Sequence, residues 1–262
     1  MSLNRSTWNK FVKARGHFRR ITEETERSVP QLKKIQQKFA DSRAGKNSSY
    51  TVETPVVYNS ALDEITADDE IKLILVADNP GRCEQAAENR RYLVGPSGKI
   101  AQKFFLGNPQ LGIDFTKNVI ILNKTPIHSP RTAELKQLCL TEDGSNSIAA
   151  SLEESQNKMA LLLLEFQEAL CVPVYIIGYS EMKKGGIFET YTETLNKLYT
   201  GKKHLYDQVF LFRHFSMNQF TIDLKKRALK GETVEKSLAR IGIAYRDRVF
   251  KIFCNKSLQI NT

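Results

Sequence analysis

Residues 73–81 read Leu-Ile-Leu-Val-Ala-Asp-Asn-Pro-Gly, and this stretch decides the fold. The continuous apolar run predicts a buried strand of a parallel sheet, and the acid, amide, Pro and Gly after it predict a polar loop. Residues 92–99, Tyr-Leu-Val-Gly-Pro-Ser-Gly-Lys, then predict a turn and a helix whose first turn begins with Pro96 and Ser97. Open α/β sheets bind ligands outside the carboxyl ends of their strands, so we expect a functional site in this loop.

Strands and helices alternate along the chain from residue 71 onward. Three further apolar runs, rich in β-branched or aromatic residues, resemble the first strand, and helical stretches separate them. This alternation predicts an α/β fold, a three-layer α/β/α arrangement around a central, mainly parallel four-stranded sheet. The predicted strands cover residues 72–76, 118–122, 173–177 and 208–212, and the predicted helices cover residues 97–105, 151–170 and 187–199.

The first fifty residues are basic and carry a helical pattern, in which Leu32, Ile35 and Phe39 recur at helical spacing. A polar connector, residues 42–49, ends this segment. We favour a helical arm that packs on the main domain, and the alternative is a basic arm that binds nucleic acid. The chain is therefore divided into a basic helical N-terminal extension, residues 1–50, and an α/β domain, residues 51–262.

The charge of the chain favours polyanionic partners, because 39 Lys and Arg against 29 Asp and Glu give a formal net charge of +10. Residues 225–248 form a basic tail dense in Lys and Arg. No apolar run approaches the length of a membrane span, and the amino terminus shows no secretory signal, so we expect a cytoplasmic protein without a membrane partner. The scattered cysteines form no Cys-x-x-Cys pair and are predicted to be reduced packing residues: Cys83, Cys139, Cys171 and Cys254.

The turn at residues 95–99, Gly-Pro-Ser-Gly-Lys, invites comparison with a nucleotide-binding P-loop. A P-loop has four residues between its glycines and Ser or Thr after its Lys. Here Leu93 stands five positions before Gly98, and Ile100 follows Lys99, so the sequence argues against an ATPase. Two interpretations stay open: an anion site made by backbone N–H groups and the Lys99 ammonium, or a plain helix start.

Polar residues stand at the carboxyl ends of the predicted strands. Asp78 and Asn79 follow the first strand, Asn123 follows the second, and His214 follows the last. Each has an ordinary structural interpretation, because Asp and Asn hold loops together and a lone His is usually a satisfied structural residue. Together, four such residues at one edge of a parallel sheet predict a functional site.

Four motifs, in this order, resemble the uracil-DNA glycosylase superfamily over residues 73–216. Val-Ala-Asp-Asn-Pro-Gly at residues 76–81 is similar to its first motif, and Leu-Val-Gly-Pro-Ser-Gly at residues 93–98 is similar to the Phe-Val-Gly-x-x-Gly element of its iron–sulphur branches. The strand at residues 119–123, followed by Lys-Thr-Pro, resembles the strand that ends in a base-reading Asn. His-Phe-Ser at residues 214–216 resembles the closing His-Pro-Ser motif.

The resemblance implies hydrolysis of the N-glycosidic bond of uracil, or of a related deaminated base, flipped out of DNA. Asp78 matches the Glu of the iron–sulphur branches and would stabilise the oxocarbenium-like sugar. Asn79 matches the residue before Pro in the uracil- and mismatch-specific branches and would hold the attacking water. Asn123 would read the base edge, and His214 would donate a hydrogen bond to the uracil carbonyl oxygen. The resemblance does not rank Asp78 against Asn79.

The same resemblance implies contacts to the DNA around the flipped base. Met217 is expected to wedge into the vacated base stack. The residues expected to grip the flanking phosphates are Ser97, Gly98, Lys99 and Ser216.

Several positions depart from the family pattern. Leu93 replaces the Phe that stacks on the base, which weakens stacking unless the neighbouring Tyr92 takes that role. Phe215 replaces the Pro of the last motif, and Gly81 stands where a Tyr excludes thymine, so strict selectivity for uracil is not expected. Tyr92, Leu93 and Gly81 still complete the predicted base-binding set with Asn123. The four-cysteine pattern is missing, so we expect no iron–sulphur centre and no other cofactor.

The leading hypothesis is therefore a DNA glycosylase that acts on DNA as a monomer. Two alternatives stay open. The first is a catalytically silent nucleic-acid-binding relative, which the Leu93 and Phe215 replacements and the basic termini suggest. The second is a hydrolase of a small nucleoside or nucleotide.

Overall fold

Four short apolar strands form one parallel sheet in the order β2-β1-β3-β4. The computed structural model of the chain describes residues 3–43, 50–140, 145–250 and 252. Each strand begins and ends within one residue of its predicted bounds, so the strand predictions are confirmed. The strands are β1 (Leu73–Ala77), β2 (Val119–Asn123), β3 (Val174–Ile177) and β4 (Val209–Phe212).

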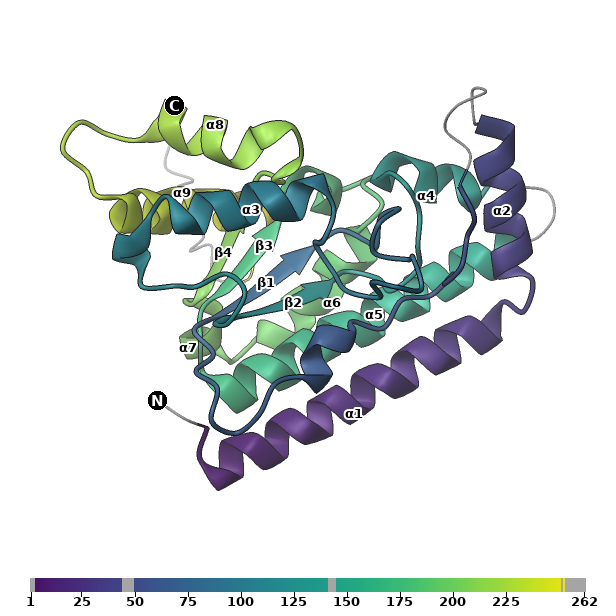
Figure 1. Ribbon diagram of the computed structural model, residues 1–262. Coiled ribbons are helices and arrows are strands. Elements are labelled where there is room, and N and C mark those ends of the chain that lie inside the picture. The colour runs from purple at the N-terminus through teal and green to yellow at the C-terminus, as the bar shows by residue number, and fades with distance from the viewer. Residues whose placement is uncertain (1–2, 44–49, 141–144, 251, 253–262) are drawn as a thin grey trace.

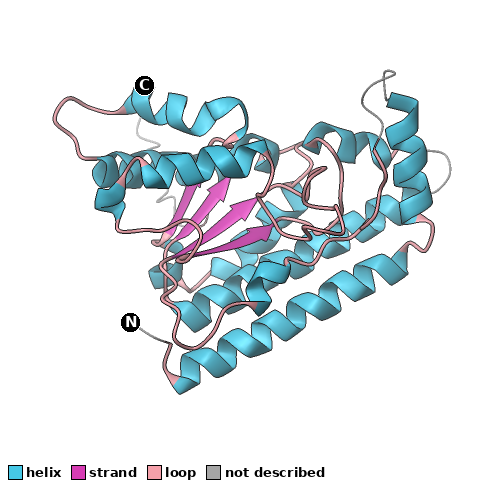
Figure 2. Ribbon diagram, viewed as in Figure 1, coloured by secondary structure: helices cyan, strands magenta, loops and turns pink. Residues whose placement is uncertain are grey.

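Helices cover both faces of this sheet, which confirms the three-layer α/β/α arrangement (Figure 1). Figure 2 shows the four strands between the two helical layers, with α3, α8 and α9 on one side and α5 and α6 on the other. The three predicted helices correspond to α3, α5 and α6. The α-helices after β1 are α3 (Pro96–Leu106), α4 (Thr132–Leu138), α5 (Ser145–Leu170), α6 (Glu189–Tyr199), α7 (Lys203–Tyr206), α8 (Gln219–Arg227) and α9 (Val234–Val249). The short 3₁₀ helices are η1 (Ser60–Asp63), which precedes β1, and η2 (Pro109–Leu111), η3 (Tyr179–Met182) and η4 (Ser216–Asn218), which follow it.

Two N-terminal helices, α1 (Arg5–Ser28) and α2 (Leu32–Arg43), precede the sheet in sequence. The side chain of Asn4 accepts a hydrogen bond from the backbone N–H of Thr7 and so caps the start of α1. The apolar side of α1 packs along α5 and forms an additional outer layer (Figure 1). Phe11 of α1, for example, lies 5.5 Å from Phe166 of α5 between ring centroids. The apolar core of the sheet therefore continues into the N-terminal segment.

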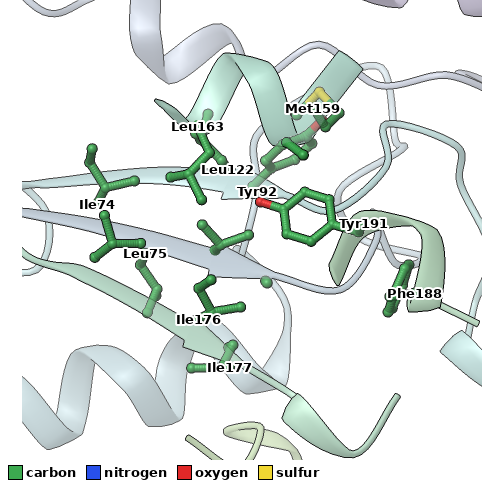
Figure 3. Packing of buried hydrophobic residues seen from close by; sticks show 14 of the residues in the cluster. Ile74, Leu75, Tyr92, Leu122, Met159, Leu163, Ile176, Ile177, Phe188 and Tyr191 are labelled. Atoms are coloured by element: carbon green, nitrogen blue, oxygen red, sulfur yellow. The ribbon is translucent and has the colours of Figure 1, made fainter. Parts of the chain in front are cut away.

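A continuous apolar core joins the sheet to the helices. Figure 3 shows Met159 and Leu163 of α5 near Leu122 of β2, with Ile74 and Leu75 of β1 alongside. A group of polar side chains is buried where β1 and β2 end, and burying such groups requires hydrogen-bond partners or a ligand. The buried polar residues at these strand ends are Asp78, Asn123, Lys124, Thr125, His128 and Ser129.

The basic stretch at residues 225–248 is more than a charged tail, because it contains the end of α8 and nearly all of α9. α9 packs on β4, and Gly242 lies directly against Phe210 of that strand. Its buried side is formed by Leu238, Ile241 and Tyr245. Among the helices of the described chain, none is long and apolar enough to cross a membrane.

Candidate active site

A cavity of about 470 Å³ opens at the carboxyl ends of the strands. Asp78 and Asn79 follow β1, Asn123 ends β2 and His214 follows β4, and all four residues line the cavity. The parallel sheet brings them together because its strands end at the same edge. Four more residues of the predicted set also line it: Gly81, Leu93, Ser97 and Ser216.

A buried ion pair holds Asp78 at the end of β1. Lys124, the residue after β2, has a fully buried side chain, and its Nζ donates to Asp78 Oδ1 at 2.5 Å. Burial lowers the pKa of the Lys124 ammonium, and the attraction of Asp78 opposes that shift. Lys124 was not among the predicted site residues, although a Lys directly after a buried strand is a usable signal in the sequence.

Asn79 is oriented by the loop that leads into α4. Its Nδ2 donates to the hydroxyl and the carbonyl oxygen of Ser129, at 3.0 and 3.1 Å. The hydroxyl oxygen of Thr132 lies 3.1 Å from Asn79 Oδ1 and 3.2 Å from Asp78 Oδ2. Its one hydrogen can therefore donate to either side chain. Because the amide hydrogens of Asn79 already have acceptors, Asn79 can offer only its carbonyl oxygen to a water in the cavity.

The amide of Asn123 faces the cavity and has no partner in the described part of the chain. Asn123 is only 2% exposed and lines the cavity, and its side chain has no hydrogen bond with any residue in the described part of the chain. The amide is therefore available to a ligand that presents both a hydrogen-bond donor and an acceptor.

His214 presents a hydrogen-bond donor on its Nε2. The backbone N–H of Ser216 donates to His214 Nδ1 at 3.0 Å, so the neutral ring carries its proton on Nε2. Burial lowers the pKa of His214, the carboxylate of Asp78 opposes this shift, and the ammonium of Lys124 adds to it. The ring is therefore neutral near pH 7 and can donate to a ligand in the cavity.

A second carboxyl group, that of Glu84, lines the same cavity and was not predicted. Backbone groups of Glu84, Gly95 and Gly81 form hydrogen bonds with it, which ties the loop after β1 to the residue that caps α3. Burial raises the pKa of Glu84, and these hydrogen bonds oppose the shift. An acidic residue three positions after Gly81 was the available signal in the sequence.

Four residues of the predicted site lie outside the cavity lining. Tyr92 is buried elsewhere, and its hydroxyl donates to the carbonyl oxygen of Val57 at 2.6 Å. Gly98 and Lys99 line a neighbouring cavity of about 520 Å³. Met217 is 83% exposed on η4 and has a left-handed backbone, with φ of 51°. The fold thus collects the predicted catalytic residues in one cavity but divides the predicted phosphate-binding set between two.

Over the described ranges, no group of three or more His, Cys, Asp or Glu side chains lies close enough to hold a metal ion. Cys83, Cys139 and Cys171 are free thiols within those ranges, and Cys254 lies outside the described residues. Cys83 and Cys171 are exposed, so the prediction of packing cysteines is wrong for these two. They lie in the loop after β1 and directly after α5, outside the apolar core.

Neither models of known protein families nor curated protein sequences match this chain. The likeness to uracil-DNA glycosylases therefore rests on the four sequence motifs. The geometry adds that polar residues of all four motifs share one cavity.

Proposed function

We propose that this protein is a DNA glycosylase that hydrolyses the N-glycosidic bond of uracil, or of a related deaminated base, flipped out of DNA. The observation that carries the proposal is that Asp78, Asn79, Asn123 and His214 line one cavity at the carboxyl edge of the sheet. On this proposal the protein acts on DNA as a cytoplasmic monomer, without a metal cluster.

The proposed reaction separates charge, and the cavity has a group suited to each side of it. Positive charge develops on the sugar as the glycosidic bond breaks, and the carboxylate of Asp78 stabilises it. Negative charge develops on the departing base, and the Nε2–H of His214 donates to it. Asn79 Oδ1 holds the water that attacks the sugar.

Asn123 recognises the base in this proposal. Its amide supplies one acceptor and two donors, and its protein environment satisfies none of them within the described chain. A base edge with adjacent N–H and C=O groups matches that pattern, as uracil and hypoxanthine both do. With glycine at position 81, the chain carries no side chain there to exclude a larger base.

Base release from defined oligonucleotides tests the proposal. Purified protein is incubated with DNA that contains uracil, hypoxanthine or a mismatch, and abasic sites are then cleaved with alkali. We expect cleavage of at least one substrate, and its loss in Asp78→Asn and His214→Ala. No product from any substrate, beside an active control glycosylase, would contradict the enzymatic proposal. Turnover of free nucleosides without activity on DNA would indicate a small-molecule hydrolase instead.

One observation favours a second candidate, a catalytically silent nucleic-acid-binding relative. Among the described residues that line the cavity, none is Phe, Tyr or Trp, and Leu93 occupies the position expected to stack on the base. An aromatic ring stacked on a base contributes about 1 to 3 kcal/mol, which this cavity lacks. Salt-sensitive DNA binding without base release supports this candidate, and binding that does not respond to salt argues against it.

A further inference from the structure

We propose that Lys124 is a positioning residue, which pairs with the carboxylate of Asp78 and fixes it at the edge of the cavity. The proposal rests on the function proposed above, since it assigns to Lys124 a role in the same reaction. Lys124 follows the strand of the third motif, but the resemblance gives it no role, and the role follows from its contacts.

Lys124 follows β2, and hydrogen bonds hold it to the ends of β1 and β3. Its Nζ donates to Asp78 Oδ1 at 2.5 Å, to the carbonyl oxygen of Ile177 in β3 at 2.6 Å, and to that of Ala77 in β1 at 3.4 Å. Its backbone N–H also lies within hydrogen-bond distance of the carbonyl oxygens of Ala77 and Asp78. An ammonium group has three donors, so every donor of Lys124 is in use.

With its donors in use and its side chain buried, Lys124 itself does not contact a ligand. Its side chain has no exposed surface, and the residue does not line the cavity, whereas Asp78 does. The ammonium also lies 5.0 Å from the ring centroid of Phe188, which closes its remaining side. Lys124 therefore acts through Asp78 and not on a substrate.

Lys124 supplies the cation that pairs with the Asp78 carboxylate, at 2.5 Å. A buried carboxylate without a cation takes up a proton, because ionisation in an apolar environment is costly. The other titratable or charged groups near the pair are His214, which is held neutral, Glu181 of η3, which acts on Lys124, and three further residues that line the cavity, Arg82, Glu84 and Arg131. None of these groups forms an ion pair with Asp78 in the described part of the chain, so Lys124→Met leaves this carboxylate without a paired cation.

The test compares base release by the wild type and by Lys124→Met over pH 5 to 9. The acid limb of the rate in Lys124→Met should move upward by at least about one pH unit, with about a tenfold loss on that limb and partial recovery at alkaline pH. The matched control is Lys158→Met, which removes a Lys paired with Glu24 and Glu154 away from the cavity. Its pH profile should match that of the wild type.

Two results would overturn the proposal. An unchanged pH profile in Lys124→Met, or an equal loss at every pH, would indicate a merely structural lysine. A covalent protein–DNA adduct after borohydride reduction, present in the wild type and absent in Lys124→Met, would identify Lys124 as a nucleophile instead.

The experiment also separates this proposal from the proposed function. If the wild type releases no base, the glycosylase proposal fails, and the pair is tested by urea unfolding at pH 7. Lys124→Met should then lower the unfolding midpoint, and the double variant Asp78→Asn/Lys124→Met should recover part of it, because no unpaired charge is left buried. A double variant no more stable than Lys124→Met would overturn the pairing role.

Discussion

Gly178 lies so close to Asp78 that a Cβ on the glycine would be 2.3 Å from Oδ1 of the carboxylate. Gly178 follows β3 and has a left-handed backbone, with φ of 78°. The carboxylate at the end of β1 therefore occupies the space that a side chain on the neighbouring strand would fill. A glycine at this position is required both by its backbone conformation and by the space for Asp78.

Replacing this glycine should displace the carboxylate. We expect Gly178→Ala to lower the free energy of unfolding by about 2 to 5 kcal/mol, from left-handed strain and the clash with Asp78. Base release should fall with it, even under conditions where the variant is fully folded. Gly201→Ala is the matched control, because Gly201 has φ of 79° and open space around its Cβ position. Gly201→Ala should lower the free energy of unfolding by only about 1 to 2 kcal/mol, from backbone strain, and leave base release unchanged.

His128 should make the stability of the protein depend on pH. Burial lowers the pKa of His128 to about 4, and the neutral ring fits its contacts, since Nδ1 lies 2.9 Å from Pro80 O and Nε2 lies 2.9 Å from Tyr50 Oη. The unfolded chain binds a proton below a pH of about 6.5, whereas the folded chain does so only near 4. Stability should therefore fall by up to about 3 kcal/mol as the pH falls through this window.

Urea unfolding of the wild type and of His128→Gln over pH 4 to 8 checks this effect. The difference in unfolding free energy between the two proteins should shrink as the pH falls, because the variant has no such proton to take up. The exposed His204 provides the control, and His204→Gln should follow the wild type. A constant difference between wild type and His128→Gln would contradict the prediction.

Asn123 should show different effects on stability and on activity. Asn123→Ala removes an amide that faces the cavity and has no partner in the described chain, so the free energy of unfolding should change little. Base release should fall by about 100-fold or more, because a recognition group is lost. A marked loss of stability in Asn123→Ala would contradict the assignment of an unpaired amide.

Asn59 gives the matched control for that variant. It is also buried, but its Nδ2 donates to the carbonyl oxygen of Ile121 and its Oδ1 accepts from the backbone N–H of Ala61 and Tyr92. We expect Asn59→Ala to lower the free energy of unfolding by about 1 to 3 kcal/mol, because these backbone groups lose their partner.

His214 should be needed for the chemical step and not for binding. We expect His214→Ala to slow base release by about 10² to 10⁴-fold with unchanged affinity for DNA, as measured by fluorescence anisotropy. Because burial lowers the pKa of His214, protonation of this ring should not reduce the rate between pH 8 and 6.5. A rate that already falls across this range in the wild type, and not in His214→Gln, would contradict the neutral donor.

The strands were predictable because helices cover both faces of the sheet, which makes each strand a nearly continuous apolar run. β1, for example, is buried along all five residues, and its sequence contains no polar side chain. α9 was not predicted, because its many Lys and Arg residues obscure the apolar row of Leu238, Ile241 and Tyr245. A helix that buries one narrow side is hard to see against such a charged background.

The candidate site was predictable only as far as the strand ends define it. Asp78, Asn123 and His214 meet because parallel strands share an edge, which the alternating pattern already implies. The contacts of Lys124 depend on how β1 and β3 flank each other, and no local pattern encodes that order. The hydroxyl of Tyr92 donates a hydrogen bond to the carbonyl oxygen of Val57, a residue far from Tyr92 in the sequence, and Tyr92 does not line the cavity.

The packing of α1 along α5 has a consequence for synthesis of the chain. α1 leaves the ribosome long before α5, yet its Phe11, Phe18 and Ile21 are fully buried only in the finished fold. At ordinary translation rates this amphipathic helix waits on the order of ten seconds for its partner. During that interval its apolar side stays exposed, and a chaperone can cover it until α5 has been made.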